Sequence, residues 1–223
     1  MHLWRVCDHA HRAQLHYRGR TGPEPECEPE PEPEPEPDEH RAGAARVRLA
    51  CSMDDTTVEV HPRGADDHAL LAALAARLLG RPTVVEHRCP TCGSADHGRP
   101  LVEGAFVSLS RAGELVAVAV SLDGPVGIDI ETVAGVAASG FDDVAFSADE
   151  AGDIRASDSP DLLRTRLWTA KEAILKARGT GLRADPRLVD THDADLDWFE
   201  PEPGYVVTVA RLRGETTSRS SAR

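Results

Sequence analysis

The chain has 223 residues, a formal net charge of −13 and 40% hydrophobic residues, which is enough apolar content for one large domain or two small ones. No basic stripe could neutralise a run of phosphates, which argues against a nucleic-acid partner. No apolar run is long enough to cross a bilayer, and the N-terminus lacks a signal-peptide core, so we expect a cytoplasmic protein without a membrane partner. Five cysteines, an odd number, do not indicate a disulfide framework.

The first part of the chain is expected to be disordered. It is rich in His and Arg, and Pro23 to Pro37 is an almost pure alternation of Glu and Pro, which favours an extended, solvated chain. The folded part is expected to begin near Ala45. The predicted boundaries are a disordered segment at 1–44, an N-terminal half at 45–122, a C-terminal half at 123–213 and a disordered tail at 214–223.

The N-terminal half begins with two short strands, predicted at 47–50 and 57–60. A helix follows, which Asp66 or Asp67 caps and which Gly80 ends, with leucines at helical spacing on its core face. Strands of alternating polarity are then predicted at 106–110 and 115–121.

A Cys-Pro-x-Cys-Gly turn built on Cys89 and Cys92 has the shape of half a zinc ribbon. Structural zinc takes four ligands, and no second Cys-x-x-Cys is present, so His87 and His97 would have to complete the set. The alternative, which we favour, is a tight turn with two packed thiols. A zinc-knuckle interaction module therefore stays open as one function.

The C-terminal half opens with an apolar strand from Val126 to Glu131. Ile128 and Ile130 point to one face of this strand, whereas Asp129 and Glu131 point to the other. Two carboxylates on one face at the end of an apolar strand are candidate metal ligands. The alternative is a half-exposed strand with ordinary outward-facing acids.

Two helices follow this strand. Ser147 and Glu150 form a capping box at the start of the first, so Glu150 has a structural explanation as well as a possible catalytic one. The second helix is predicted at 160–178, with a proline at its first position and Gly179 at its left-handed exit. A last strand is predicted at 205–210.

The 160–178 helix carries the only two lysines, Lys171 and Lys176, among 25 lysine and arginine residues in all. An ammonium is a compact point charge with rotatable donors, and phosphate sites can demand it where arginine otherwise serves. Glu172 lies on the polar side of the helix near Lys176. With the two strand carboxylates, this set suits Mg²⁺ on a pyrophosphate. The alternative is an ordinary solvated Glu-Lys pair.

Three motifs, in this order and spacing, resemble those of the 4'-phosphopantetheinyl transferases, in the larger form that activates peptide and polyketide synthases. The motifs are Val-Gly-Ile-Asp-Ile-Glu at 126–131, Phe-Ser-x-x-Glu at 146–150 and Trp-Thr-x-Lys-Glu-Ala-x-x-Lys-x-x-Gly-x-Gly at 168–181. The resemblance implies an α+β fold, in which two similar halves of a monomer form a pseudo-dimer with the active site in the cleft between them.

The resemblance also implies that coenzyme A and Mg²⁺ bind in this cleft. Asp129, Glu131 and Glu172 would hold the metal on the coenzyme A pyrophosphate. Lys171 and Lys176 would contact phosphates, and Lys176 would thereby contribute to catalysis.

A serine of an apo acyl or peptidyl carrier protein would attack the β-phosphate and release 3',5'-ADP. Glu172, or Glu150 through a water, is the candidate base. The expected function is therefore phosphopantetheinyl transfer, in polyketide or nonribosomal peptide biosynthesis. Besides the zinc knuckle, a homologue that binds coenzyme A or a carrier protein without transfer is the alternative.

The chain departs from the family pattern at the nucleotide end of the site. The usual Ser-His-Ser or Ser-His-Thr segment, which touches the 3'-phosphate, corresponds to Ser110-Arg111-Ala112, and Gly-Lys-Pro corresponds to Gly98-Arg99-Pro100. Arginine can also contact phosphate, so we expect function to survive. An arginine expected near the start of the first helix is replaced by His68. The candidate coenzyme-binding residues are Lys171, Lys176, Arg111, Arg99, Ser110 and His68.

Overall fold

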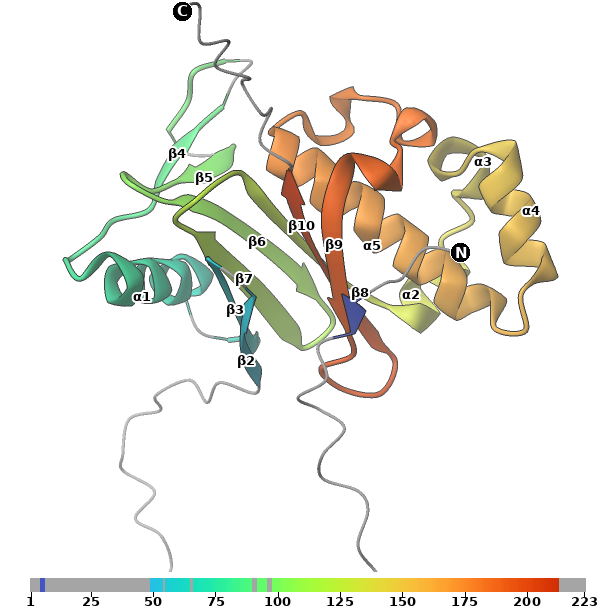
Figure 1. Ribbon diagram of the computed structural model, residues 1–223, viewed down its shortest axis with the longest axis horizontal. Coiled ribbons are helices and arrows are strands. Elements are labelled where there is room, and N and C mark those ends of the chain that lie inside the picture. The colour runs from blue at the N-terminus through green and yellow to red at the C-terminus, as the bar shows by residue number, and fades with distance from the viewer. Residues whose placement is uncertain are drawn as a thin grey trace, which may run out of the picture. The chain divides into compact units, whose positions relative to one another are not determined.

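The computed structural model describes residues 5–6, 49–53, 55–64, 66–89, 92–95 and 98–212 (Figure 1). The predicted tail at 214–223 lies outside the described residues. Within the segment predicted to be disordered, only the short strand β1 (Arg5–Val6) is described, where it pairs in parallel with the edge of a sheet. In the described part of the chain, no helix is long and apolar enough to cross a membrane.

The N-terminal half forms a four-stranded antiparallel sheet with the order β2-β3-β7-β6. Its strands are β2 (Leu49–Met53), β3 (Thr56–Pro62), β6 (Phe106–Ala112) and β7 (Leu115–Ser121). Helix α1 (Asp67–Leu79) packs on one face. As predicted, Asp66 caps this helix, accepting hydrogen bonds from two backbone N–H groups, and Gly80 ends it with a positive φ of 66°. A small hairpin of β4 (Glu86–Arg88) and β5 (Arg99–Leu101) lies between α1 and β6 in the chain.

The C-terminal half forms the second four-stranded sheet, with the order β1-β9-β10-β8. Its longer strands are β8 (Val126–Thr132), β9 (Ala194–Phe199) and β10 (Tyr205–Leu212). Helix α5 (Pro160–Arg178) has the predicted bounds and packs against β8 and β10 (Figure 1). The shorter helices are α2 (Val133–Ala138), α3 (Asp142–Ala145), α4 (Ala148–Ala156) and the 3₁₀ turns η2 (Gly181–Arg183), η3 (Pro186–Leu188) and η4 (Thr191–Asp193).

Both sheets are built on the same connection pattern. In each half one strand is followed by a long helix and then by two more strands. The last of these strands, β7 or β10, lies between the other two in the sheet and is antiparallel to both. The N-terminal unit is β3-α1-β6-β7, and the C-terminal unit is β8-α5-β9-β10. The mixed α and β architecture agrees with the predicted α+β class.

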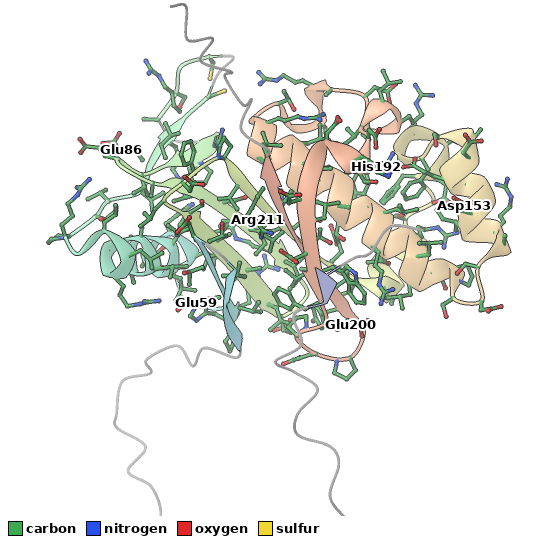
Figure 2. The ribbon with its side chains drawn as sticks, viewed as in Figure 1. Glu59, Glu86, Asp153, His192, Glu200 and Arg211 are labelled. Carbon is green, nitrogen blue, oxygen red and sulfur yellow. The ribbon has the colours of Figure 1, made fainter. Side chains whose placement is uncertain are left out.

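The two sheets share a core, and each carries buried polar groups on its other face. Val58 and Val60 of β3 belong to the same buried cluster as Ile128 and Ile130 of β8. Between these valines, Glu59 turns toward α1 (Figure 2), where it accepts a hydrogen bond from Arg77 of α1 and lies 2.9 Å from the ring of His61. At the edge where the sheets meet, the Ser108 hydroxyl of β6 accepts the Ile128 N–H at 3.0 Å.

The approach of α5 to β8 depends on the glycine at position 127. A Cβ atom added there would overlap the Ala173 carbonyl oxygen and lie 2.6 Å from the Ala177 nitrogen. We therefore expect Gly127→Ala to lower the free energy of unfolding by about 1–3 kcal/mol, because α5 must shift away from the strand. Chemical denaturation measures this. Gly124→Ala is the matched control, since nothing lies within 4 Å of its added Cβ, and it should cost less than about 0.5 kcal/mol.

Candidate active site

The carboxylates predicted as metal ligands lie together beneath α5. The alternation of β8 turns Asp129 and Glu131 away from the shared core and toward the helix, while Glu172 projects from α5 one turn before Lys176. Asp129 is 2% exposed, and the two glutamates are partly buried. The three acids that were predicted to share a site thus lie near one another, although they come from two distant segments of the chain.

Lys176 is the cation of this cluster. Its Nζ donates to Asp129 Oδ1 at 2.6 Å and to the Ser110 hydroxyl at 2.8 Å. Ser110 in turn donates to the same Asp129 oxygen at 2.7 Å. Ser110 thus orients the lysine and the aspartate, in addition to any contact that it makes with a ligand.

Burial raises the pKa of all three carboxyl groups, and repulsion by neighbouring carboxylates raises the pKa of the two glutamates further. Burial raises the pKa of Asp129, although Lys176 and Ser110 oppose the effect. Burial and the neighbouring Asp129 raise the pKa of Glu172. The same two causes raise the pKa of Glu131 to about 7, against the lowering effect of Lys176 and of a hydrogen bond from Trp168. One ammonium therefore balances only part of the negative charge.

Unsatisfied oxygens indicate that the cluster fits a divalent cation. Asp129 Oδ2 and Glu172 Oε1 are buried and accept no hydrogen bond. Hard carboxylate oxygens without donors are suitable ligands for Mg²⁺. Among the described residues no three acidic, histidine or cysteine side chains converge closely enough to hold an ion in this conformation. Lys176 fills the space beside Asp129 Oδ1 instead.

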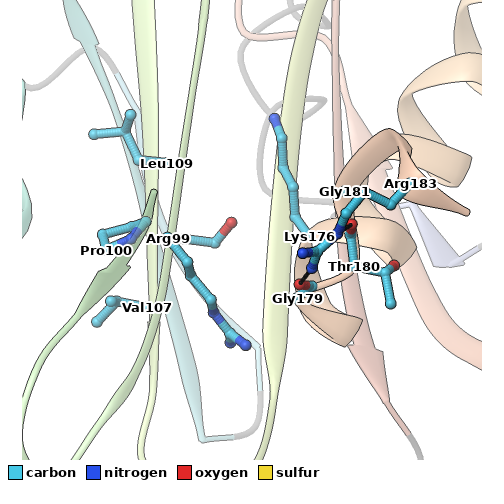
Figure 3. A pocket seen from close by; sticks show the side chains of 10 residues that line it. Arg99, Pro100, Val107, Leu109, Lys176, Gly179, Thr180, Gly181 and Arg183 are labelled. Carbon is cyan, nitrogen blue, oxygen red and sulfur yellow. Dashed lines mark hydrogen bonds between the residues drawn. The ribbon is translucent and has the colours of Figure 1, made fainter. Parts of the chain in front are cut away.

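A pocket of about 350 Å³ adjoins the cluster on the side of Lys176. Arg99 of β5 and Lys176 of α5 face this pocket from opposite sides (Figure 3). Arg99 lies against Gly179, its Nε is buried without a hydrogen-bond partner, and burial lowers its pKa. With Arg183, three cationic residues line the pocket, which makes it suitable for an anion. The full lining is Arg99, Pro100, Val107, Ser108, Leu109, Lys176, Gly179, Thr180, Gly181 and Arg183.

Lys171 does not join this set, and the phosphate contact implied for it is not supported by its position. Its side chain is fully buried on another side of α5, where Nζ donates to Glu150 Oε2 at 2.7 Å and to the Pro186 carbonyl at 2.8 Å. Glu150 Oε2 also accepts the Ser147 N–H at 2.8 Å, which confirms the predicted capping box. Two donors on one oxygen give Glu150 a structural role.

Arg111 and His68 are not part of the pocket lining either. Arg111 points from β6 to α1, where its Nε donates to Asp67. The His68 ring makes an edge contact with the ring of His87, with 4.6 Å between centroids. The side chains of these neighbouring residues on β6 point to opposite faces, since Ser110 faces Asp129 and Arg111 faces α1.

Backbone hydrogen bonds at Cys89 and Gly93 agree with the predicted turn, but Cys92 is exposed, so the predicted packing of both thiols is wrong; Pro90 and Thr91 lie outside the described residues. The Gly93 N–H donates to the Cys89 carbonyl at 2.8 Å, and the Cys89 N–H donates to the Ser94 carbonyl at 2.9 Å. The described residues show no zinc cluster at Cys89 and Cys92. His97, a candidate ligand, lies outside them.

Sequence reasoning missed three contributors to the site. Trp168 donates a hydrogen bond to Glu131, and its place in the Trp-Thr-x-Lys-Glu motif was the available signal. Thr180 and Arg183 line the pocket just beyond α5. No spacing rule indicated them, because η2 brings them to the pocket only after the helix has ended.

Comparison with known proteins shows a family similarity in this part of the chain. Residues 125–218 match the model of the 4'-phosphopantetheinyl transferase superfamily. This part of the chain, which holds all three motifs, is similar to that superfamily, in agreement with the resemblance. The larger subtype stays a prediction.

A particular relative agrees with the family. The chain is 33% identical to the L-aminoadipate-semialdehyde dehydrogenase-phosphopantetheinyl transferase of Eremothecium gossypii, with 56% of this chain and 55% of the relative covered. The chain thus spans about half the length of this curated relative.

The pKa of Glu131 leads to a prediction for pH dependence. Because folding raises this pKa to about 7, the folded protein binds the proton more tightly, and this contribution to stability is lost as the pH rises to and through 7. Between about pH 5 and about pH 8, Glu131→Gln should therefore gain about 1–2 kcal/mol in free energy of unfolding relative to wild type, after allowance for solvent screening. Denaturant titrations at both pH values test this. Glu103→Gln, at a 94% exposed side chain, should show no such gain.

The buried Lys171–Glu150 pair leads to a prediction for stability. Lys171→Met should lower the free energy of unfolding by on the order of 3 kcal/mol, because it leaves a partly buried carboxylate without its cation. A double-mutant cycle with Glu150→Gln should give a favourable coupling energy. If Lys171→Met instead retained full stability and lost coenzyme A binding, Lys171 would be assigned to a phosphate contact after all.

Proposed function

We propose that the protein transfers the 4'-phosphopantetheine group of coenzyme A to a serine of an apo acyl or peptidyl carrier protein, with Mg²⁺, and releases 3',5'-ADP. One observation carries the proposal: Lys176, which neighbours three interacting carboxylates, lines a pocket that Arg99 also lines. These residues come from the superfamily motifs and from the corresponding Gly-Arg-Pro segment.

The cationic side chains would bind and orient the coenzyme. Lys176 and Arg99 face the pocket and can donate to phosphate oxygens. Phosphoryl-type transfers are catalysed mainly by such positioning and charge stabilisation. Bound Mg²⁺, held by Asp129, Glu131 and Glu172, would polarise the pyrophosphate and neutralise its developing charge.

The reaction exchanges one phosphorus–oxygen bond for another. The serine oxygen of the carrier protein attacks the β-phosphorus, the bond from that phosphorus to the bridging oxygen breaks, and 3',5'-ADP leaves. The serine proton passes to a base. Glu172 suits this role better than Glu150, because its Oε1 has no donor and its pKa is raised, whereas Glu150 Oε2 already accepts from two donors.

The internal repeat supports the finer part of the fold prediction. Two units with one connection pattern, joined by a common apolar cluster, are what a monomeric pseudo-dimer requires. The pocket draws on both, with Val107 from the N-terminal unit and Lys176 from the C-terminal unit. We propose that coenzyme A binds there. The dehydrogenase in the name of the relative is stated for that protein alone. For this chain we propose a polyketide or peptide synthase carrier and a cytoplasmic location.

Intact-protein mass spectrometry tests the proposal. An apo carrier protein incubated with the enzyme, coenzyme A and Mg²⁺ should gain the mass of one phosphopantetheine, and omission of Mg²⁺ should prevent the gain. Glu172→Gln should reduce the rate by on the order of a hundredfold or more, whereas Glu103→Gln should not.

The contrary results are equally specific. Coenzyme A binding by calorimetry without any mass gain, over a panel of acyl and peptidyl carrier proteins, would identify a binding homologue. Full loss of transfer in a stably folded Glu150→Gln variant would move the base to Glu150.

A further inference from the structure

The Lys176–Asp129 ion pair has a counterpart in the N-terminal unit. Helices α1 and α5 both end at a left-handed glycine, Gly80 (φ 66°) and Gly179 (φ 69°). Arg77 stands three residues before the first and Lys176 three residues before the second. Each of these cations pairs with an acid on the first strand of its own unit, Glu59 for Arg77 and Asp129 for Lys176. Each of the two units thus has one ion pair between a cation on its helix and a carboxylate on its first strand.

The two copies differ in how much negative charge surrounds the pair. Seven residues before the terminal glycine, α1 has Ala73 where α5 has Glu172. On the strand, His61 follows Glu59 at the spacing at which Glu131 follows Asp129. The N-terminal copy is therefore a closed pair of one acid and one arginine, with a histidine beside it. The C-terminal copy has three acids for one ammonium, and two of its buried oxygens accept nothing.

We propose that Lys176 is an exchangeable counter-cation. A divalent cation bound by the three carboxylates takes over the charge of Asp129, and the ammonium is released from that carboxylate to the pocket that Arg99 lines. This inference rests on the proposed function. Cation binding thus frees the ammonium of Lys176 for an anion in the pocket, so cation and phosphate binding reinforce each other.

The contacts of the two lysines explain why only one of them can exchange. A dication and an ammonium on the same buried carboxylate repel each other at short range. The Lys176 side chain is 27% exposed and lines the pocket, so its flexible stem can move without opening the core. Lys171 has no exposed surface and is held by two acceptors. It is therefore a fixed reference within the same helix.

The composition of the chain makes the exchange directly observable. Protein labelled with ¹³C-lysine gives side-chain NMR signals from Lys171 and Lys176 alone, and Lys176→Arg assigns them. On titration with Mg²⁺, without coenzyme A and at about pH 8.5, above the pKa of about 7 of Glu131, the Lys176 Cε signal should shift. The Lys171 signal should stay in place.

Metal affinity gives a second measurement. Lys176→Met should bind Mn²⁺ more tightly than wild type, by roughly tenfold or more in Kd from electron paramagnetic resonance titration, because the competing charged hydrogen bond is gone. Arg178→Met is the matched control. This variant removes one positive charge from the same helical turn, but Arg178 pairs with Asp193 and not with the three carboxylates. The substitution should therefore change Kd by less than about twofold.

The outcomes separate this inference from the proposed function. Absence of any Mn²⁺ binding by the wild type overturns the metal assignment and the exchange with it. Mn²⁺ binding with an unmoved Lys176 signal, or with equal or weaker binding by Lys176→Met, overturns the exchange alone and leaves the transferase proposal standing.

Discussion

Asp129 lies beneath α5 with its charge balanced by one ammonium 2.6 Å away, while two further carboxylates share the same partly buried space. Such a cluster is costly to form, because each acid loses water and repels the others. The surrounding structure lowers this cost. Ser110 and Trp168 donate hydrogen bonds, and Gly127 lets α5 approach closely enough for Lys176 to reach the strand. The site therefore depends on the contact between one helix and one strand.

Local signals predicted the elements that build this contact. The bounds of α5, the cap at Asp66, the left-handed exits at Gly80 and Gly179 and the capping box at Ser147 all follow from nearby residues, and the structure has each of them. The alternation of β8 likewise predicted that Asp129 and Glu131 share a face. These features could be predicted because the interactions that cause them span fewer than about five residues.

Positions that depend on tertiary contacts were harder to predict. Lys171 lies on the buried side of α5, between Leu167 and Ile174, and the partners that hold it come from α4 and η3. Arg111 and His68 were assigned to the coenzyme by resemblance, which stays a prediction; in the structure Arg111 contacts α1 and His68 contacts β4. The pocket contributions of Thr180 and Arg183 depend on how the chain turns after Gly179.

The engagement of both lysines has a practical consequence for chemical work on this protein. Every primary side-chain amine of the chain sits in one folded helix and is paired with a carboxylate. Amine-directed cross-linkers and lysine-specific proteases thus find no loosely held lysine on which to act. A reagent small enough to enter the pocket would react at Lys176 before Lys171, so the native chain offers a single addressable lysine, located where the coenzyme is proposed to bind.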